Sequence, residues 1–387
     1  MGVESGEPEE PISRAVVGWC AGRISDPLLR LKFLQTAGPA WTAAEESHRL
    51  ARRRVPPAGY LLPPLLLLLP VSIFLLRNSH ATVSAAPTLR PPLLMPERRP
   101  SEIWLVEQNG GSETYSNGLR IDDRFVVTNH PRAYRAFPME GGAGVARTRP
   151  VGIVFHTTES PQAPLAAEQN RVLKRIGESL IGYVQRKRAY HFLIDRFGRV
   201  YRIVKEEDAA NHAGHSVWAD GQWLYVNLNE SFLGVSFEAE TRAGETESHV
   251  SAAQLRSAGM LVEMLRKKYG IRGANCVTHG QVSVNPSNME VGYHVDWASS
   301  FPFSGIGLMD NYSQPLPAVW AYGFESDTAF LHRAGPRLAA SAVAAEQSLA
   351  EAARRARLPV RVYRKLLRKQ YRDHLAEMHR PIAEDAE

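Results

Sequence analysis

Cysteine is almost absent from this sequence, which has only Cys20 and Cys276 among its 387 residues. Two cysteines exclude a disulfide framework and a four-cysteine zinc site, so a metal would have to be held by histidine and carboxylate side chains. Strong charge is lacking as well, because the formal net charge is only +6. A solvated basic face explains this excess as readily as an anionic partner does, and we expect no nucleic-acid ligand.

Long apolar runs are also lacking, with one exception. The stretch YLLPPLLLLLPVSIFLL, residues 60–76, has no charge and is just long enough to cross a bilayer. Arginines are denser before it than after it, so a transmembrane anchor at 58–77 would leave the N-terminus in the cytoplasm. The small residues 83–85 allow a cleaved signal instead. Either interpretation exports the rest of the chain, and we expect a membrane-anchored or secreted protein with its folded part in the periplasm or another extracytoplasmic space.

The composition changes several times along the chain. Residues 1–57 mix glycine, proline and charge and predict a cytoplasmic tail with little stable structure, and residues 78–100 are typical of an extended linker. From residue 101, short apolar strands alternate with helical patterns. This alternation predicts a mixed α/β domain over 101–335, with its core at 150–305, in which helices flank a single mixed central sheet. A basic helical tail follows at 336–387.

Periodicity and turn residues predict individual elements of this domain. We expect strands at 102–108, 123–129, 152–155, 232–240 and 275–279, a hairpin at 190–204, and helices at 164–183 and 251–270, the second starting with a Ser251–Gln254 capping box.

The tail predicts a pair of amphipathic helices that pack either on the domain or on a membrane face. Its stretch SLAEAARRARLPVRVYRKL, residues 348–366, also faintly resembles the helix-turn-helix core of a LysM sugar-binding module, although the flanking strands of such a module are not apparent.

Two histidines stand at the ends of apolar runs, His156 after GIVF and His279 after CVT. Each alone is explained by a core imidazole bonded to a backbone carbonyl, but two strand ends can meet at one edge of a sheet. The stretch YHVDW adds His294 and Asp296 as possible neighbours. Two histidines and one carboxylate leave the fourth tetrahedral position of zinc open for water, which is the arrangement of a catalytic site.

With these motifs the chain resembles the amidase type 2 family, which includes zinc-dependent N-acetylmuramoyl-L-alanine amidases and peptidoglycan recognition proteins. The resemblance covers roughly residues 150–305. It rests on IVFHTTES, AYHFLIDRFGRVYRIV, NHAGHSVWADGQWLYVNLNESFLGVSFE, and VTHG followed by HVDWASSFPF. It implies that His156, His279 and Asp296 bind zinc and that Tyr190 is catalytic.

The sequence departs from the family pattern at three places. The loop from His279 to Asp296 is longer than expected, His294 stands where relatives usually carry a lysine that supports the oxyanion, and Ser236 replaces a glutamate base of some relatives. Because residues two apart on a strand share a face, Glu238 is the candidate base, and His294 is the candidate partner of the oxyanion.

Further residues are candidates for contact with substrate. Thr157 and Thr158 follow the first histidine, and they either touch substrate or form hydrogen bonds behind the metal ligands. Four more residues would line the cleft, although plain packing explains them equally well: His212, His215, Trp218 and Trp223.

The resemblance implies hydrolysis of the amide between the lactyl group of muramic acid and L-alanine, in peptidoglycan or muropeptides, by zinc-activated water. Two alternatives remain. One is a non-catalytic module of the same fold that binds peptidoglycan, and the other is a scaffold protein in which the basic tail carries the function. Non-catalytic relatives often lose the third ligand, so the presence of Asp296 favours the enzyme.

Overall fold

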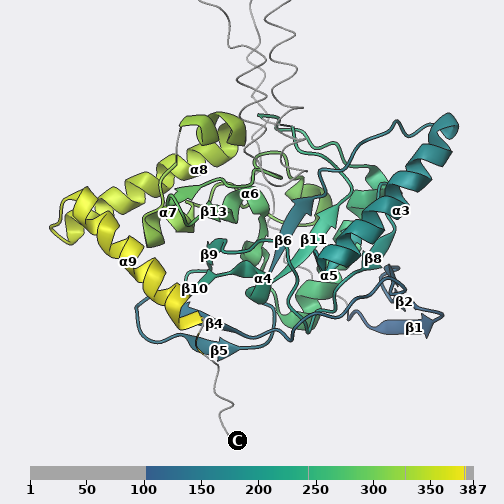
Figure 1. Ribbon diagram of the computed structural model, residues 1–387, viewed down its shortest axis with the longest axis horizontal. Helices are drawn as coiled ribbons and strands as arrows, with labels where there is room; N and C mark the ends of the chain where they lie inside the picture. The colour runs from purple at the N-terminus through teal and green to yellow at the C-terminus, as the bar shows by residue number, and fades with distance from the viewer. Residues whose placement is uncertain (1–101, 243, 327, 379, 381–387) are drawn as a thin grey trace, which may run out of the picture. The chain divides into compact units, whose positions relative to one another are not determined.

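The computed structural model describes residues 102–242, 244–326, 328–378 and 380 (Figure 1). The predicted cytoplasmic tail, the apolar segment at 58–77 and the linker lie outside these residues. Within them, no helix has the length and apolar character needed to span a membrane.

An eight-stranded mixed sheet forms the centre of the described part, in the order β1-β2-β3-β8-β7-β11-β6-β12. Its strands are β1 Leu105–Asn109, β2 Ser112–Tyr115, β3 Arg120–Asp122, β6 Gly152–Thr157, β7 Phe192–Ile194, β8 Val200–Arg202, β11 Phe232–Phe237 and β12 Cys276–Thr278. Strands β7, β11, β6 and β12 run parallel to one another. The expected mixed α/β fold with one large central sheet is therefore present.

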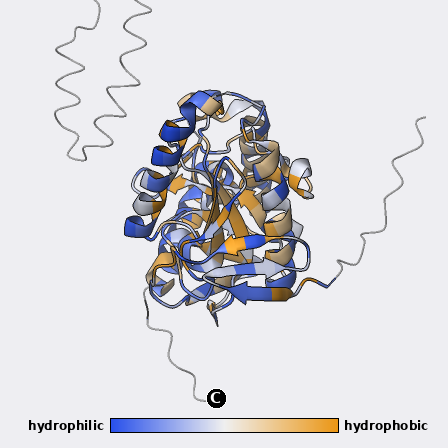
Figure 2. Ribbon diagram, turned by 90° about the vertical axis from the view of Figure 1, so that its right-hand side faces the viewer, coloured by the Kyte–Doolittle hydropathy of each residue, from blue (hydrophilic) through white to orange (hydrophobic). Residues whose placement is uncertain are grey.

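The central strands β6 and β11 are buried at every position. Strands covered on both faces are expected to be continuously apolar, and this is why GIVF and FLGVSF lack polar alternation. Figure 2 shows the apolar residues gathered in the strands at the centre and polar residues on the outer helices. The parallel pairing brings the C-terminal ends of β6, β11 and β12 to one edge of the sheet.

Smaller sheets and the helices complete the fold. The remaining strands are β4 Tyr134–Pro138, β5 Val145–Arg147, β9 Val217–Ala219 and β10 Trp223–Val226 in one sheet, and β13 Val284–Asn285 with β14 Glu290–Val291 in another. The α-helices are α3 Asn170–Lys187, α4 Leu228–Ser231, α5 Ala252–Tyr269, α6 His279–Val282, α7 Pro317–Tyr322, α8 Thr328–Arg355 and α9 Val360–Met378. Short 3₁₀ helices occupy Ala167–Gln169, Gly273–Asn275 and Phe303–Ile306.

Several predicted elements are confirmed and two need correction. The capping box of α5 is present, and the predicted hairpin is β7–β8. The predicted strand at 123–129 is wrong: the Asp122 carboxylate accepts from the backbone of Arg124 and forms a turn, so that only Val127 bridges to a neighbour. The helix expected from residue 164 begins at Asn170, because Ala166 is extended.

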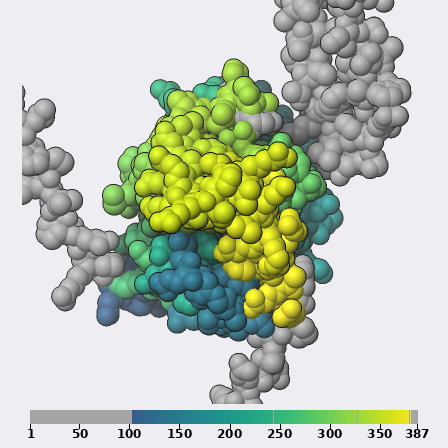
Figure 3. Space-filling model, turned by 90° about the vertical axis from the view of Figure 1, so that its left-hand side faces the viewer, coloured from purple at the N-terminus to yellow at the C-terminus, as the bar shows by residue number. Residues whose placement is uncertain are grey.

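The two C-terminal helices pack on the domain, which was one of the two placements considered for them. In Figure 3, α8 and α9 spread over one face of the molecule, above the blue and teal strands. The ring of His374 on α9 stacks on Phe137 of β4, with centroids 3.8 Å apart, and its Nδ1 lies 2.8 Å from the Tyr322 hydroxyl. Since such contacts anchor a helix to a core, α9 is part of the same packed body as the sheet.

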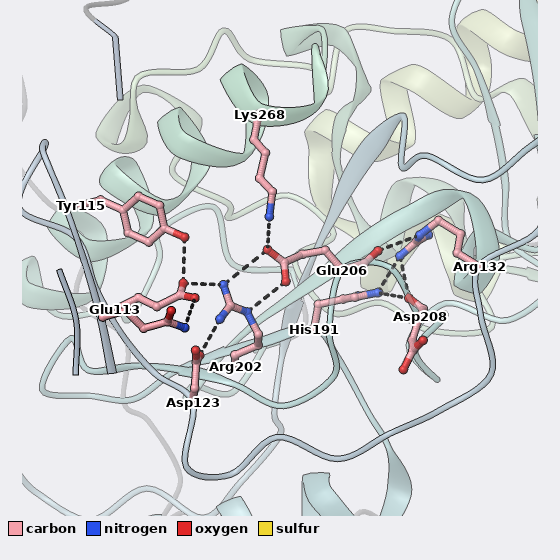
Figure 4. A network of polar contacts seen from close by, with 10 residues as sticks. Glu113, Tyr115, Asp123, Arg132, His191, Arg202, Glu206, Asp208 and Lys268 are labelled. Atoms are coloured by element: carbon pink, nitrogen blue, oxygen red, sulfur yellow. Dashed lines mark hydrogen bonds and ion pairs between the residues drawn. The ribbon is translucent and has the colours of Figure 1, made fainter. Parts of the chain in front are cut away.

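A buried cluster of charged residues fastens the β1–β3 meander to β8 (Figure 4). The Arg202 guanidinium lies 2.9 Å from Glu113, 2.6 Å from Asp123 and 2.9 Å from Glu206. Lys268 of α5 completes it at 3.2 Å from Glu206. Three carboxylates around one guanidinium satisfy a cation that burial would otherwise make costly.

Candidate metal centre

Three predicted ligands meet at the C-terminal edge of the central sheet. His156 is near the end of β6, His279 begins α6 directly after β12, and Asp296 comes from the loop after β14. Nδ1 of His156 lies 3.2 Å from Oδ2 of Asp296, and Nδ1 of His279 lies 2.8 Å from Oδ1. All three side chains are buried, and their ligand atoms lie within 4.8 Å of one another.

The electrostatics of the group suit a divalent cation. Burial lowers the pKa of His156 to about 4, and the charge of His279 acts in the same direction. Burial raises the pKa of Asp296, but the charge of His279 and the close approach of both histidine rings outweigh it and hold that pKa well below its usual range. At neutral pH the site therefore presents a neutral imidazole at His156 and a carboxylate at Asp296.

The donor set fits a metal by chemistry and by spacing. Two imidazole nitrogens and one carboxylate oxygen are ligands that zinc takes, and tetrahedral bonds of about 2.0–2.1 Å place ligand atoms roughly 3.3 Å apart. The 3.2 Å separation of His156 from Oδ2 of Asp296 is close to that value, and the 2.8 Å separation of His279 from Oδ1 is shorter. The residues can therefore hold a metal ion, whereas their role as ligands stays a prediction.

The loop that carries Asp296 is held by three hydrogen bonds. Gly280 N–H donates to the Asp296 carbonyl at 2.9 Å, and Trp297 N–H donates to the Thr241 hydroxyl at 3.1 Å. The Tyr312 hydroxyl donates to the Trp297 carbonyl at 2.5 Å. Gly280 is required here because a Cβ atom would lie 2.8 Å from Cα of Ala298 and 3.2 Å from the Asp296 carbonyl oxygen.

Gly280→Ala should weaken metal binding by about ten- to a hundredfold, because displacing the Asp296 loop acts like the loss of a group that orients a ligand. Zinc affinity measured by competition with a chromophoric chelator checks this. Gly177→Ala on α3 is the matched control, since a Cβ atom there meets nothing within 4 Å. Equal affinity in both variants would show that the close approach at Gly280 is irrelevant to the metal.

The stretch between His279 and Asp296, which the sequence analysis expects to be longer than in relatives, has regular structure. It holds the short hairpin β13–β14. His294 follows this hairpin, is exposed, and stacks on His279 with ring centroids 4.7 Å apart. Its backbone N–H donates to the Ser283 hydroxyl at 2.8 Å. His294 therefore lies against the metal group, and its role toward the substrate stays a prediction.

Tyr190 connects α3 to β7 and turns its ring toward His156, with centroids 5.0 Å apart. Its φ is +63°, a left-handed backbone that costs a non-glycine residue roughly 1–3 kcal/mol and is typical of functional positions. Burial raises the pKa of Tyr190 above its usual value, and the charge of Asp296 raises it further. The hydroxyl is therefore protonated at neutral pH and can donate a hydrogen bond.

Two predicted site residues point elsewhere. The Glu238 carboxylate accepts from the backbone N–H of Arg196 at 3.2 Å, so it faces the β7–β8 turn. Trp218 is 3% exposed within an apolar cluster, and its indole N–H donates to the Asn275 side chain at 3.2 Å. The cavity that it borders, with Asp220 and Trp320, includes no member of the metal group. The predicted site positions of Glu238 and Trp218 followed from sequence spacing, and the tertiary packing of the two side chains corrects them.

The hydroxyl residues after His156 form hydrogen bonds among themselves. Thr157 donates to the Glu159 carboxylate at 2.5 Å, and that carboxylate also accepts from the Thr241 backbone at 3.0 Å. Thr158 pairs with Ser160 at 2.7 Å. Thr157 therefore supports the loops around the metal group, which was one of the two roles considered for it.

The predicted cleft histidines differ in position. His215 is exposed. His212 lies behind His156, with its Nδ1 3.1 Å from Nε2 of that residue. Sequence reasoning missed Thr241 and Tyr312, which hold the Asp296 loop. Isolated threonines and tyrosines carry no motif, so only the fold reveals them.

Residues 146–292 match the model of the amidase type 2 family, described as N-acetylmuramoyl-L-alanine amidase. The predicted resemblance is thus confirmed over this segment of the chain. The matched segment includes His156, Tyr190 and His279 but ends before Asp296. No curated protein matches the chain.

Similar solved structures are of the same kind. They include the N-acetylmuramoyl-L-alanine amidase LysC of Clostridium intestinale (24% identity, 47% of this chain, 93% of that chain, TM-score 0.24). The E. coli amidase AmiD, in complex with an anhydro-N-acetylmuramic acid peptide, is 19% identical over 51% of this chain and 64% of its own, with a TM-score of 0.30. Drosophila peptidoglycan recognition protein SD is 18% identical over 41% of this chain and 85% of its own, with a TM-score of 0.26. Because these TM-scores are low, the family assignment rests on the matched segment.

Proposed function

We propose that this protein is a zinc-dependent N-acetylmuramoyl-L-alanine amidase that cleaves the bond between the lactyl group of muramic acid and L-alanine. The observation that carries the proposal is the buried group of His156, His279 and Asp296 at the sheet edge, two members of which lie in the matched amidase segment. Zinc at this position supplies Lewis acidity, which polarises the scissile carbonyl and makes the attacking water more acidic.

The side chains around the site supply binding and proton transfer. Tyr190, protonated and held near His156, donates a hydrogen bond to the oxygen of the carbonyl as negative charge develops on it. His294, which stacks on His279, lies where it can support the same oxygen. Both side chains are held against histidines of the metal group, so they would be in place before substrate binds.

The residue that accepts a proton from the attacking water is not the expected Glu238 in this proposal. Glu238 faces Arg196, and position 236 is a serine. Glu159 is an exposed carboxylate whose charge raises the pKa of Tyr190, and its Oε1 is fixed by Thr157 and Thr241. We assign proton acceptance during attack by water to Glu159, whose carboxylate is already oriented.

The competing proposal is a module that binds peptidoglycan without cutting it. The complete set of three ligands favours the enzyme, because a binding module has no need of an ionised, buried aspartate between two histidines. To test this, the zinc-loaded full chain is incubated with a defined muropeptide and the products are weighed by mass spectrometry. Release of the stem peptide with a free L-alanine amine supports the amidase, and binding with the muropeptide left intact supports the module.

We also propose that the protein is exported, through the uncharged segment at 58–77 and the arginines before it. A reporter that is active only outside the cytoplasm, fused after residue 100 of the chain, should be active in living cells. A fusion active only with a cytoplasmic reporter would contradict export. This expected outcome is independent of the amidase chemistry.

A further inference from the structure

His212 lies directly behind His156, on the side away from Asp296. Its Nδ1 is 3.1 Å from Nε2 of His156, and its own Nε2 is 3.2 Å from the carbonyl oxygen of Phe232. We propose that His212 is a positioning residue, which fixes the protonation pattern of His156 so that Nδ1 of His156 is the atom that binds the metal. This inference rests on the proposed zinc site and identifies the residue that orients one of its ligands.

The protonation pattern follows from one fixed acceptor. A backbone carbonyl accepts hydrogen bonds and cannot donate them, so Nε2 of His212 carries a proton and donates to Phe232. In a neutral ring Nδ1 is then the acceptor. Because Nδ1 of His212 faces Nε2 of His156, the proton between them belongs to His156. A doubly protonated His212 would instead put a positive charge beside the bound cation.

The same pattern leaves Nδ1 of His156 without a proton. That nitrogen faces Oδ2 of Asp296 at 3.2 Å, so a lone pair and a carboxylate oxygen, two acceptors, point at one another. A metal cation that both ligate removes this conflict, and Nε2–H to a fixed partner is the usual way a ligating histidine is oriented. The partner here is a second histidine, itself bonded to the backbone.

The Phe232 carbonyl is held in place from the far side. Arg132, a buried residue, donates to it at 3.3 Å and to the Asp208 carbonyl at 3.0 Å. His191 accepts from the backbone N–H of Gly234 at 2.9 Å and lies beside Arg132 (Figure 4). The Phe232 carbonyl, which accepts the hydrogen bond from His212, is therefore held by Arg132 as well as by the pairing of its strand in the sheet.

Two further features hold the His212 ring itself. The Asn229 side-chain oxygen accepts from the backbone N–H groups of His212, Ala213 and Gly214, at 2.8, 2.7 and 2.9 Å. Gly234 provides the surface beneath the ring, because a Cβ atom there would lie 2.7 Å from Cγ of His212. The contact between the His212 ring and Gly234 therefore joins the NHAG stretch to the strand FLGVSF.

The test compares zinc affinity in four full-length chains, by competition with a chromophoric chelator. His212→Ala should bind zinc about ten- to a hundredfold more weakly than wild type, as expected when a group that orients a ligand is lost. His212→Asn should recover most of the affinity, because its amide oxygen can replace Nδ1 as acceptor. His332→Ala, an exposed histidine on α8, should bind like wild type.

A second measurement uses the wild-type chain, so it does not require that a variant folds. In the zinc-loaded wild-type chain, nitrogen NMR shifts of His156 should show a protonated Nε2 and a metal-bound Nδ1. A protonated Nδ1, or a His212→Ala chain with wild-type zinc affinity, would overturn the inference while leaving the amidase proposal in place. A wild-type chain that binds no zinc would overturn the proposed function and this inference with it.

Discussion

Replacing any one of His156, His279 or Asp296 with alanine should abolish zinc retention and lower muropeptide turnover by about a thousandfold or more. A zinc ion bound by these three residues, as proposed, would stabilise the transition state by several kcal/mol, and each 1.4 kcal/mol is a factor of ten in rate. Two remaining ligands cannot close the tetrahedral site, since catalytic zinc uses three protein ligands. Metal content per chain after dialysis and turnover measured on the same samples check this result.

The domain should still fold in these variants, because the apolar clusters of the sheet and helices do not include the three side chains. Circular dichroism establishes folding before activity is compared. Asp373→Ala on α9 is the matched control, because it removes an exposed carboxylate that pairs with Lys369 on the same helix. A variant of any of the three that retains both full zinc and full turnover would remove that residue from the ligand set.

Tyr190→Phe should lower kcat by about a hundred- to a thousandfold while zinc stays bound. The hydroxyl is the one group lost, and deleting a single donor to a developing oxyanion costs about 2.7–4 kcal/mol. Since zinc and the ring packing against His156 are kept, KM for the muropeptide should change little. Steady-state kinetics on the zinc-loaded variant separate these two quantities.

Tyr363→Phe, a partly buried tyrosine on α9, should leave kcat unchanged. If Tyr190→Phe instead loses zinc, the tyrosine holds the metal site together and its catalytic assignment is wrong. If kcat and zinc content both match wild type, neither role stands.

Much of the fold could be predicted because the sequence pattern and the packing agree. The strand GIVF is apolar throughout because β6 is covered on both faces, and the Ser251–Gln254 box starts α5 where the pattern indicates. The failures are local. The apolar letters of FVV at 125–127 suggest a strand, but the preceding Asp122 carboxylate captures the backbone of Arg124 and makes a turn.

The meeting of the three candidate ligands at one place was predictable, whereas the residues that support them were not. His156 and His279 follow short apolar runs, and parallel strand ends meet at one sheet edge. Glu238 could not be placed from spacing, because a backbone N–H in the β7–β8 turn, that of Arg196, binds its carboxylate. The position of His212 behind His156 depends on the carbonyl of Phe232, a main-chain group that no sequence motif encodes.

The most direct test of the central claim is a zinc titration of the full-length, metal-stripped chain, with amide cleavage of a muropeptide followed at every step. If the claim is correct, cleavage is absent without metal, rises in proportion to added zinc, and reaches its plateau at one zinc per chain, with free L-alanine amine as the new end group. A metal-stripped chain that cleaves at the full rate, or one that takes up zinc without any cleavage, would contradict it.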